Sequence, residues 1–245
     1  MDNFYTKRKV VRVKLLVIGR RKNFFEKEIR KEKKLILVKN HPDVIVAFGG
    51  EGTFLYSEMV YPEIPKLLVY HSSKCKKCKK HNYKKIIKDL TVKKFKVVNF
   101  VKIQASVNNK RLIGLNEINI HYKPPCALRF DVDINNKPIV RECVGDGLVV
   151  STPYGSSGYF SSITRKTFEK GLGIAFNNPV KPIKPRIVPK DSVIKVKIVR
   201  GPGVLCVDCN KEVIPLKTGD VIKIQKHINY ARILKINGEN RKVKI

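Results

Sequence analysis

The spacing of apolar residues changes character near residue 94, and this change limits the folds open to the chain. Before it, apolar strands alternate with charged segments, as an α/β layer requires. Strands are expected at Val10 to Ile18, Leu35 to Val38 and Val44 to Phe48. A charged helix is expected to start at Asn23, which would cap it, and to end at Lys34, and a second helix is expected at Asn82 to Leu90. The sequence therefore predicts an α/β N-terminal domain over residues 1–93.

After residue 94 the chain reads as strand after strand, with β-branched residues between turn signals. The expected strands are Lys94 to Val107, Arg111 to Tyr122, Leu128 to Ile134, Lys137 to Val144, Gly147 to Ser151, Ser192 to Arg200, Val204 to Val207, Asp220 to Gln225 and Ala231 to Ile236. The Pro-rich stretch from Asn177 to Pro189 is predicted to be an extended surface connection. A second, all-β domain is expected over residues 94–228.

The charge of the chain calls for an anionic partner. Its 245 residues contain 52 Lys and Arg against 20 Asp and Glu, a formal net charge of +32. Thermophilic ion-pair networks need Glu to rise along with Lys, and here the acids are scarce. So basic a surface attracts polyphosphates, and RNA is the expected macromolecular partner. The alternative is a solvated basic shell around an enzyme for anionic substrates.

The sequence indicates a cytoplasmic protein that does not cross a membrane. Its longest apolar stretches, such as Leu15 to Gly19 and Val44 to Gly50, fall far short of the roughly 18 residues of a membrane span. The N-terminal apolar run is brief and no cleavage site follows it, so no secretory signal is expected. Six cysteines in such a chain suggest metal or redox chemistry in a reducing compartment.

A glycine-rich turn follows the predicted strand that ends at Phe48. Gly49, Gly50 and Gly52 would let backbone N–H groups approach phosphate oxygens, and a helix beginning after Thr53 would add its positive end. An ordinary strand-to-helix turn has the same composition, so this signal is weak by itself.

A denser polar segment runs from Gly145 to Tyr159, where a buried strand leads into small hydroxyl residues and glycines. Small residues allow a ligand to approach closely, hydroxyls can bond phosphate, ribose or base edges, and Tyr159 could pack on a base. Asn116 and Glu117 lie ahead of it, within the apolar strand expected from Leu112 to Ile120. Adjacent polar residues there cost stability unless they have partners, and functional sites tolerate such costs.

These segments resemble those of the ATP-dependent NAD kinase family, whose fold is related to that of diacylglycerol kinases and phosphofructokinases. The turn from Gly49 to Thr53 is similar to the family's Gly-Gly-Asp-Gly-Thr loop, Asn116-Glu117 to its Asn-Glu pair, and Asp146 to Tyr159 to its Asp-Gly…Ser-Thr-Pro-Thr-Gly-Ser-Thr-Ala-Tyr stretch. The resemblance implies that the second domain is sandwich-like, and that residues 229–245 return to complete the first domain.

The resemblance also implies roles. The glycine turn would hold ATP phosphates with Mg²⁺, and Glu51 would act on the hydroxyl that is phosphorylated. Asn116 and Glu117 would bind ribose hydroxyls of NAD or a related nucleotide, and Asp146 would contact the far end of the dinucleotide. The adenine pocket would be lined by Ser157, Gly158 and Tyr159.

Three departures from the family pattern bear on activity. Position 51 is Glu where the family has Asp, which moves the carboxylate one methylene farther out. The segment from His71 to His81 replaces the family's Asn-Gly-x-Leu-Gly-Phe segment at the substrate. Ser157 and Gly158 replace Thr and Ala, which are mild changes, whereas Tyr154 in place of Thr would narrow the pocket.

Two Cys-x-x-Cys pairs, Cys75 with Cys78 and Cys206 with Cys209, have the spacing of zinc knuckles. A joint structural Zn²⁺ site is expected, since the resemblance brings both segments near the substrate. Three alternatives remain open: the pairs form a redox dithiol or a disulfide, His71 or His81 replaces one of the zinc ligands, or the thiols have unrelated roles. Cys126 and Cys143 are expected to be small core residues.

Seven lysines lie between Lys74 and Lys85, around the first cysteine pair. A basic knuckle beside a nucleotide pocket is typical of RNA-binding proteins, although a solvated loop has the same composition. Two functions follow: a NAD kinase-like phosphotransferase with a basic, RNA-attracting surface, or an RNA-binding protein, associated with tRNA or the ribosome, on the same fold with weak or lost kinase activity. Association of the chain with further copies of itself, as a homo-oligomer, is also expected.

Overall fold

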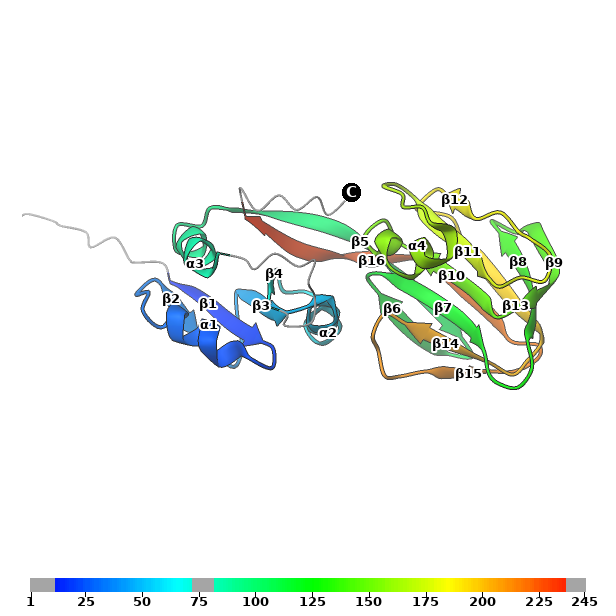
Figure 1. Ribbon diagram of the computed structural model, residues 1–245, viewed down its shortest axis with the longest axis horizontal. Helices are drawn as coiled ribbons and strands as arrows, with labels where there is room; N and C mark the ends of the chain where they lie inside the picture. The colour runs from blue at the N-terminus through cyan, green and yellow to red at the C-terminus, as the bar shows by residue number, and fades with distance from the viewer. Residues whose placement is uncertain (1–11, 72–81, 237–245) are drawn as a thin grey trace, which may run out of the picture. The chain divides into compact units, whose positions relative to one another are not determined.

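The computed structural model describes residues 12–71 and 82–236, and the chain divides into two compact units (Figure 1). Of the described residues, unit 1 contains 12–57, 61–71, 82–98 and 232–236, and unit 2 contains 58–60 and 99–231. The long strands β5 (Phe95–Val107) and β16 (Val221–Ile236) contribute residues to both units.

Unit 1 is built on a parallel sheet. The strands β1 (Val13–Ile18), β2 (Leu35–Leu37), β3 (Val44–Gly49) and β4 (Lys66–Tyr70) lie in the order β2-β1-β3-β4, and the end of β16 pairs with β4. All these pairs are parallel. Because the chain moves to one side of β1 for β2 and to the other side for β3, the strand order reverses beside β1, where α/β sheets bind ligands at their carboxyl ends.

The core of unit 1 explains why β3 is buried along its whole length. Helices α1 (Lys22–Ile29) and α3 (Tyr83–Thr91) place apolar residues in one cluster with alternate residues of the sheet. This cluster contains Phe25 and Ile29 of α1, Ile86, Ile87 and Leu90 of α3, and Val44, Val46 and Phe48 of β3. The intervening β3 residues Ile45 and Ala47 are also buried, as expected for a parallel strand that is covered on both faces.

Unit 2 contains two antiparallel sheets (Figure 1). One has the order β12-β11-β10-β7-β14-β15, and the other runs from β16 through β13 and β8 to β9, with β5 pairing with β16 and β6. Their bounds are β6 Lys110–Gly114, β7 Glu117–Tyr122, β8 Leu128–Ile134, β9 Lys137–Gly145, β10 Gly147–Ser151, β11 Leu172–Asn177, β12 Arg186–Val188, β13 Ile194–Arg200, β14 Gly203–Val207 and β15 Ile214–Leu216.

One apolar cluster joins the inner faces of both sheets, so unit 2 is a β-sandwich. In β10, Leu148 and Val150 face this cluster, and Val149 is buried as well. The outer face is covered by the short helix α4 (Tyr159–Thr164), which contacts β10 and β11 and places Phe160 against Ala175. The predicted fold class, an α/β domain followed by a sandwich-like β domain, is confirmed.

Several predicted elements need correction. The strand expected from Arg111 to Tyr122 is two strands, β6 and β7, separated at Leu115 and Asn116, whose backbone N–H groups bond a carboxylate instead of a neighbouring strand. The two strands expected after residue 220 are the single strand β16. The Pro-rich stretch contains β12, which lies at a sheet edge, where proline neighbours are tolerated. Strands β4, β11 and β15 and helix α4 were not predicted.

The predicted start and end of the first helix and the predicted burial of Cys126 are also wrong. Helix α1 begins at Lys22 after Arg21, so Asn23 is not its cap, and it ends at Ile29 because a series of tight turns then leads into β2. Cys143 is buried as expected, whereas Cys126 is exposed in the turn before β8.

The helices are short. α1, α3 and α4 have 8, 9 and 6 residues, and α2 (Glu51–Val60) has 10. Over the residues that the structure describes, none of them has the length and apolar character needed to cross a bilayer.

Gly147 offers a test of the sandwich geometry. Its φ is +132°, and an added Cβ would overlap the carbonyl oxygen of Ile120 on β7. Gly219 also has a positive φ, +93°, but open space surrounds it. Gly219→Ala should therefore cost about 1–2 kcal/mol of backbone strain alone, while Gly147→Ala should cost more than about 3 kcal/mol. Urea unfolding measures both, and equal losses would show that the close approach of β10 to β7 is wrong.

Candidate functional site

The glycine turn of unit 1 leaves an open space at the start of α2. Gly49 ends β3, Gly50 caps the helix in an extended conformation, and Glu51 is the exposed first helical residue. An added Cβ at Gly49 would come within 2.5 Å of the Thr53 hydroxyl oxygen, so packing requires this glycine. Nothing lies within 4 Å of a Cβ at Gly50 or Gly52. Those two positions leave backbone N–H groups accessible at the positive end of a helix, which suits phosphate.

His71 lies beside this turn. It follows β4, and its backbone N–H donates to the carbonyl oxygen of Gly49 at 3.0 Å. Its ring stacks on Phe48 with centroids 4.5 Å apart, and Nδ1 lies 2.8 Å from the hydroxyl of Tyr83. His71 therefore belongs to an aromatic cluster at the carboxyl edge of the parallel sheet. The rest of the segment that departs from the family pattern, residues 72–81, lies outside the described residues.

In unit 2, one carboxylate holds the backbone at Asn116 and Glu117. Asp208, which follows β14, accepts hydrogen bonds from the backbone N–H groups of Leu115 at 2.7 Å, Asn116 at 2.9 Å and Glu117 at 3.0 Å. Asp208 adopts a left-handed backbone conformation, with φ +46°. Bonds from N–H groups to an ionised carboxylate are roughly twice as strong as neutral ones. We call this arrangement of Asp208 and residues 115–117 the Asp208 clamp.

The carbonyl side of the same segment is held by the start of the polar run after β10. Thr152 donates from Oγ1 to the carbonyl oxygen of Leu115 at 2.6 Å, and from its backbone N–H to that of Asn116 at 2.8 Å. An added Cβ at Gly155 would overlap the backbone of Asn116. The backbone of the segment is thus fixed from both sides, and Asn116 is buried, with only 5% of its surface exposed.

The polar run from Ser151 to Tyr159 lies against Glu117. It forms a 3-10 turn at Gly155–Ser157 and then enters α4. An added Cβ at Gly158 would be 3.7 Å from the Glu117 carboxylate, so the absence of a side chain at Gly158 leaves space beside that carboxylate. Ser157 and Gly158 are exposed and Tyr159 is half-buried, so all three can be reached by a ligand.

Asp146 and Tyr159 form a second polar group of unit 2. The Tyr159 hydroxyl accepts a hydrogen bond from Nδ2 of Asn177 at 3.0 Å, and Asp146 Oδ2 accepts one from Nδ2 of Asn178 at 2.7 Å. Burial, and after it the negative charge of Asp146, raise the pKa of Tyr159. Neither asparagine was predicted as a site residue, because their segment reads as a surface connection; two adjacent amides before a proline were the available signal.

The second cysteine pair flanks the clamp. Cys206 is half-buried in β14, where burial raises the pKa of its thiol, and Cys209 is exposed. Cys75 and Cys78 lie outside the described residues. Within the described ranges, 12–71 and 82–236, there is no group of three or more His, Cys, Asp and Glu that could hold a metal ion. Joint zinc binding stays a prediction. Asp208 lies between the two cysteines in sequence, and the Cys-x-x-Cys spacing gave no sign that it would bond the backbone of residues 115–117.

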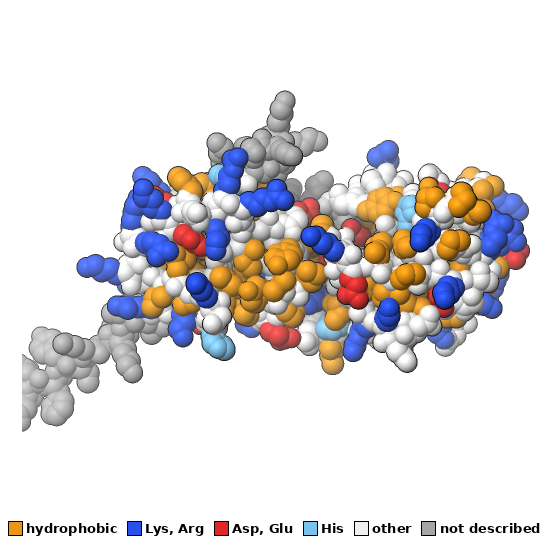
Figure 2. Space-filling view, turned by 90° about the horizontal axis from the view of Figure 1, so that it is seen from below, with side chains coloured by type: hydrophobic (Ala, Val, Ile, Leu, Met, Phe, Trp, Pro, Cys, Tyr) orange, Lys and Arg blue, Asp and Glu red, His pale blue; other side chains and the backbone are white. Residues whose placement is uncertain are grey.

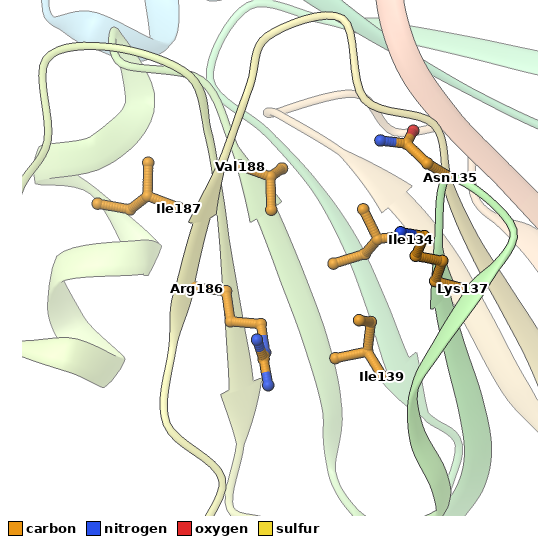
Figure 3. Close-up of a pocket in the computed structure, with 7 residues that line it drawn as sticks. All are labelled: Ile134, Asn135, Lys137, Ile139, Arg186, Ile187 and Val188. Carbon is orange, nitrogen blue, oxygen red and sulfur yellow. The ribbon is translucent and has the colours of Figure 1, made fainter.

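A cavity of about 480 Å³ lies elsewhere in unit 2 (Figure 3). It opens between the turn that joins β8 to β9 and the edge strand β12, and each side contributes apolar side chains and one cation. Its lining residues are Ile134, Asn135, Lys137, Ile139, Arg186, Ile187 and Val188. This cavity contains none of the site residues expected from the sequence.

Comparisons with known sequences agree on one family. The family model described as "ATP-NAD kinase C-terminal domain" matches residues 115–236. An NAD kinase of Sulfurisphaera tokodaii is 33% identical over 168 residues, which span 66% of this chain and 66% of the relative. An NAD kinase of Saccharolobus solfataricus is 26% identical over 199 residues, 79% of each chain.

Solved structures show the same fold. The yeast NADH kinase complexed with NADH matches with a TM-score of 0.79 at 17% identity, covering 95% of this chain and 86% of that one. An NAD kinase from Archaeoglobus fulgidus in complex with ATP matches with a TM-score of 0.71 at 19% identity, covering 92% and 94%. At these identities the likeness concerns the fold alone.

The Asp208 clamp can be tested by removing its charge. Asp208→Asn keeps the size of the side chain but weakens three charge-assisted hydrogen bonds, so it should lower the free energy of unfolding by about 2–4 kcal/mol. Asp131→Asn is the matched control, because Asp131 accepts a single backbone N–H, from Glu142, at an exposed site. Urea unfolding should show a loss below about 1.5 kcal/mol for this control. A loss at Asp208 no larger than the control's would contradict the clamp.

Proposed function

This chain is a member of the NAD kinase family, and from that premise we propose that it transfers a phosphoryl group from ATP to a ribose hydroxyl of NAD or a closely related nucleotide. The observation that carries the proposal is the fixed backbone at Asn116 and Glu117, held by Asp208 on one side and Thr152 on the other. Such rigidity suits a site that orients an acceptor, since phosphoryl transfer depends mostly on positioning and charge stabilisation.

The donor phosphates are assigned to the glycine turn of unit 1. The open backbone at Gly50 and Gly52, at the start of α2, supports this assignment. Phosphate oxygens would accept from backbone N–H groups there, while the helix dipole stabilises their charge. Thr53 contributes a hydroxyl close to Gly49.

The acceptor nucleotide is assigned to unit 2. Asn116 and Glu117 can donate to and accept from ribose hydroxyls, and the exposed Ser157 and Gly158 offer a surface without bulk beside Glu117. Tyr159 can pack on a base and Asp146 can accept a hydrogen bond from the far end of the dinucleotide. These roles are proposals supported by the contacts among the residues and by the family resemblance.

A divalent metal ion, usual in this family, would neutralise phosphate charge when it is bound with ATP. Mg²⁺ usually keeps several waters and binds one or two carboxylates together with substrate phosphates. Glu51, in the first turn of α2, is the residue of the glycine turn that would hold it or accept the proton of the attacking hydroxyl.

The proposal predicts NADP formation when the purified protein is incubated with NAD, ATP and Mg²⁺. Glu51→Gln should lower kcat by about 10²–10⁴, the range for loss of a general base. Glu32→Gln is the control, since Glu32 is exposed on the same unit and away from the glycine turn in sequence. An enzymatic assay for NADP measures both variants.

Two outcomes of that assay would count against the proposal. If Glu51→Gln forms NADP at the wild-type rate, Glu51 does not take part in catalysis. If neither the wild type nor Glu51→Asp, which restores the residue of the family pattern, makes NADP, then NAD is the wrong acceptor.

RNA binding is a second candidate function, favoured by the charge. Even if every one of the 20 acidic residues paired with one cation, 32 of the 52 Lys and Arg would remain unpaired. Figure 2 shows more Lys and Arg than Asp and Glu on the visible face of the described residues. Most of the lysine-rich segment from Lys74 to Lys85 lies outside the described residues, so its part in RNA binding stays a proposal.

RNA binding should be strongly salt-dependent. Each phosphate that is neutralised on a single strand contributes about −0.7 to the slope of log K against log salt, so about six contacts give a loss of roughly two to three orders of magnitude from 50 to 200 mM. Reversing Lys76, Lys77, Lys79 and Lys80 to Glu should weaken binding and flatten the slope. The matched control reverses four exposed lysines of unit 2: Lys197, Lys211, Lys217 and Lys223. Equal effects of the two sets would point to a diffuse basic shell.

A further inference from the structure

Asn177 is the last residue of strand β11, and Asn178 follows it in a tightly held backbone. The carbonyl oxygen of Asn177 accepts a hydrogen bond from the Asp146 backbone N–H at 3.0 Å. An added Cβ at Gly145 would lie 2.9 Å from the carbonyl oxygen of Asn178 and 3.0 Å from that of Asn177. The Val180 N–H bonds the carbonyl oxygen of Val144 at 2.9 Å just beyond them. The positions of both asparagines are therefore fixed against the segment that carries Asp146.

Each asparagine directs its side-chain amide to a different group of the nucleotide site. Asn177 donates from Nδ2 to the Tyr159 hydroxyl at 3.0 Å, and Asn178 donates from Nδ2 to Asp146 Oδ2 at 2.7 Å. Asn178 has a left-handed backbone, with φ +44°, which turns the chain between the two amides. Asparagine tolerates that conformation better than most residues.

These bonds determine whether Tyr159 and Asp146 can donate or accept a further hydrogen bond. Because the Tyr159 oxygen accepts from Asn177, the phenol proton remains available for donation to another group. Because Asp146 Oδ2 is occupied by Asn178, Oδ1 remains as an acceptor. The two groups are bonded by adjacent residues of the chain, Tyr159 by Asn177 and Asp146 by Asn178. The pair thus offers one donor and one acceptor in fixed places.

We propose that Asn177 and Asn178 are positioning residues of the nucleotide site, Asn177 acting through the Tyr159 hydroxyl and Asn178 through the Asp146 carboxylate. The inference rests on the proposed function, because it assigns both partners to nucleotide binding. The simpler alternative is that the asparagines only end β11 and stabilise the sandwich. A structural role of that kind would affect folding, but it would not depend on the presence of the Tyr159 hydroxyl.

The first experiment is a double-mutant cycle in NAD binding, measured by titration calorimetry on the full chain. Asn177→Ala and Tyr159→Phe should each weaken binding by about fivefold, the ratio for one neutral hydrogen bond. The double variant should be no weaker than Tyr159→Phe alone, because Asn177 then has no hydroxyl to position. Additive losses would overturn the role of Asn177.

Asn178 is tested with glycine, which keeps the left-handed backbone and removes the amide. Asn178→Gly should weaken NAD binding in the wild-type chain and have no further effect when Asp146 is already alanine. Asn109→Gly is the control, since Asn109 has a φ of +62° in an exposed turn between β5 and β6, and it should leave NAD binding unchanged. An effect of Asn178→Gly that persists without the Asp146 carboxylate would overturn its role.

A readout that needs no nucleotide separates this inference from the proposed function. In protein with ring-¹³C tyrosine, the Tyr159 resonance is identified by its loss in Tyr159→Phe. Asn177→Ala should shift that resonance, and Asn109→Gly should not. If the wild type fails to bind NAD while the resonance shifts, the proposed acceptor is wrong and the positioning of the phenol stands. If the resonance does not move, the positioning role is overturned whatever NAD binding shows.

Discussion

The structure of unit 2 depends on one carboxylate that accepts three consecutive backbone N–H groups. Asp208 takes the donors of Leu115, Asn116 and Glu117, which would otherwise have to bond a neighbouring strand. Backbone donors that are buried without a partner are costly, so this carboxylate is what allows the chain to leave β6 and re-enter the other sheet as β7. Asn116 and Glu117 lie at this break between the two strands.

Close backbone approaches then turn this break into a site. Gly155 lies so near the backbone of Asn116 that no side chain would fit, and Gly158 leaves room beside the Glu117 carboxylate. The glycine turn of unit 1 is built differently. Gly49 ends a parallel strand just before a helix begins, and Gly50 and Gly52 leave the backbone N–H groups there accessible to a ligand. Glycines thus allow close packing at Gly49 and Gly155, and they leave space at Gly50, Gly52 and Gly158.

The parts of this structure that could be predicted from sequence are those encoded locally. The change from alternating strands and helices to continuous strands gave the fold class, and the glycine turn, Asn116-Glu117 and the run up to Tyr159 were visible as motifs. Asp208 was not recognised because its partners are 91–93 residues away and bind it through their backbone, which leaves no pattern in side-chain types. The bonds of Asn177 and Asn178 are long-range in the same sense.

A crystal structure of the protein with NAD would show whether the clamped segment of unit 2 binds the acceptor nucleotide. Ribose hydroxyls should then lie within hydrogen-bond distance, about 2.6–3.2 Å, of the Asn116 and Glu117 side chains, with Asp208 still bound to the backbone behind them. A dinucleotide bound away from these two residues, for example in the cavity beside β12, would contradict it.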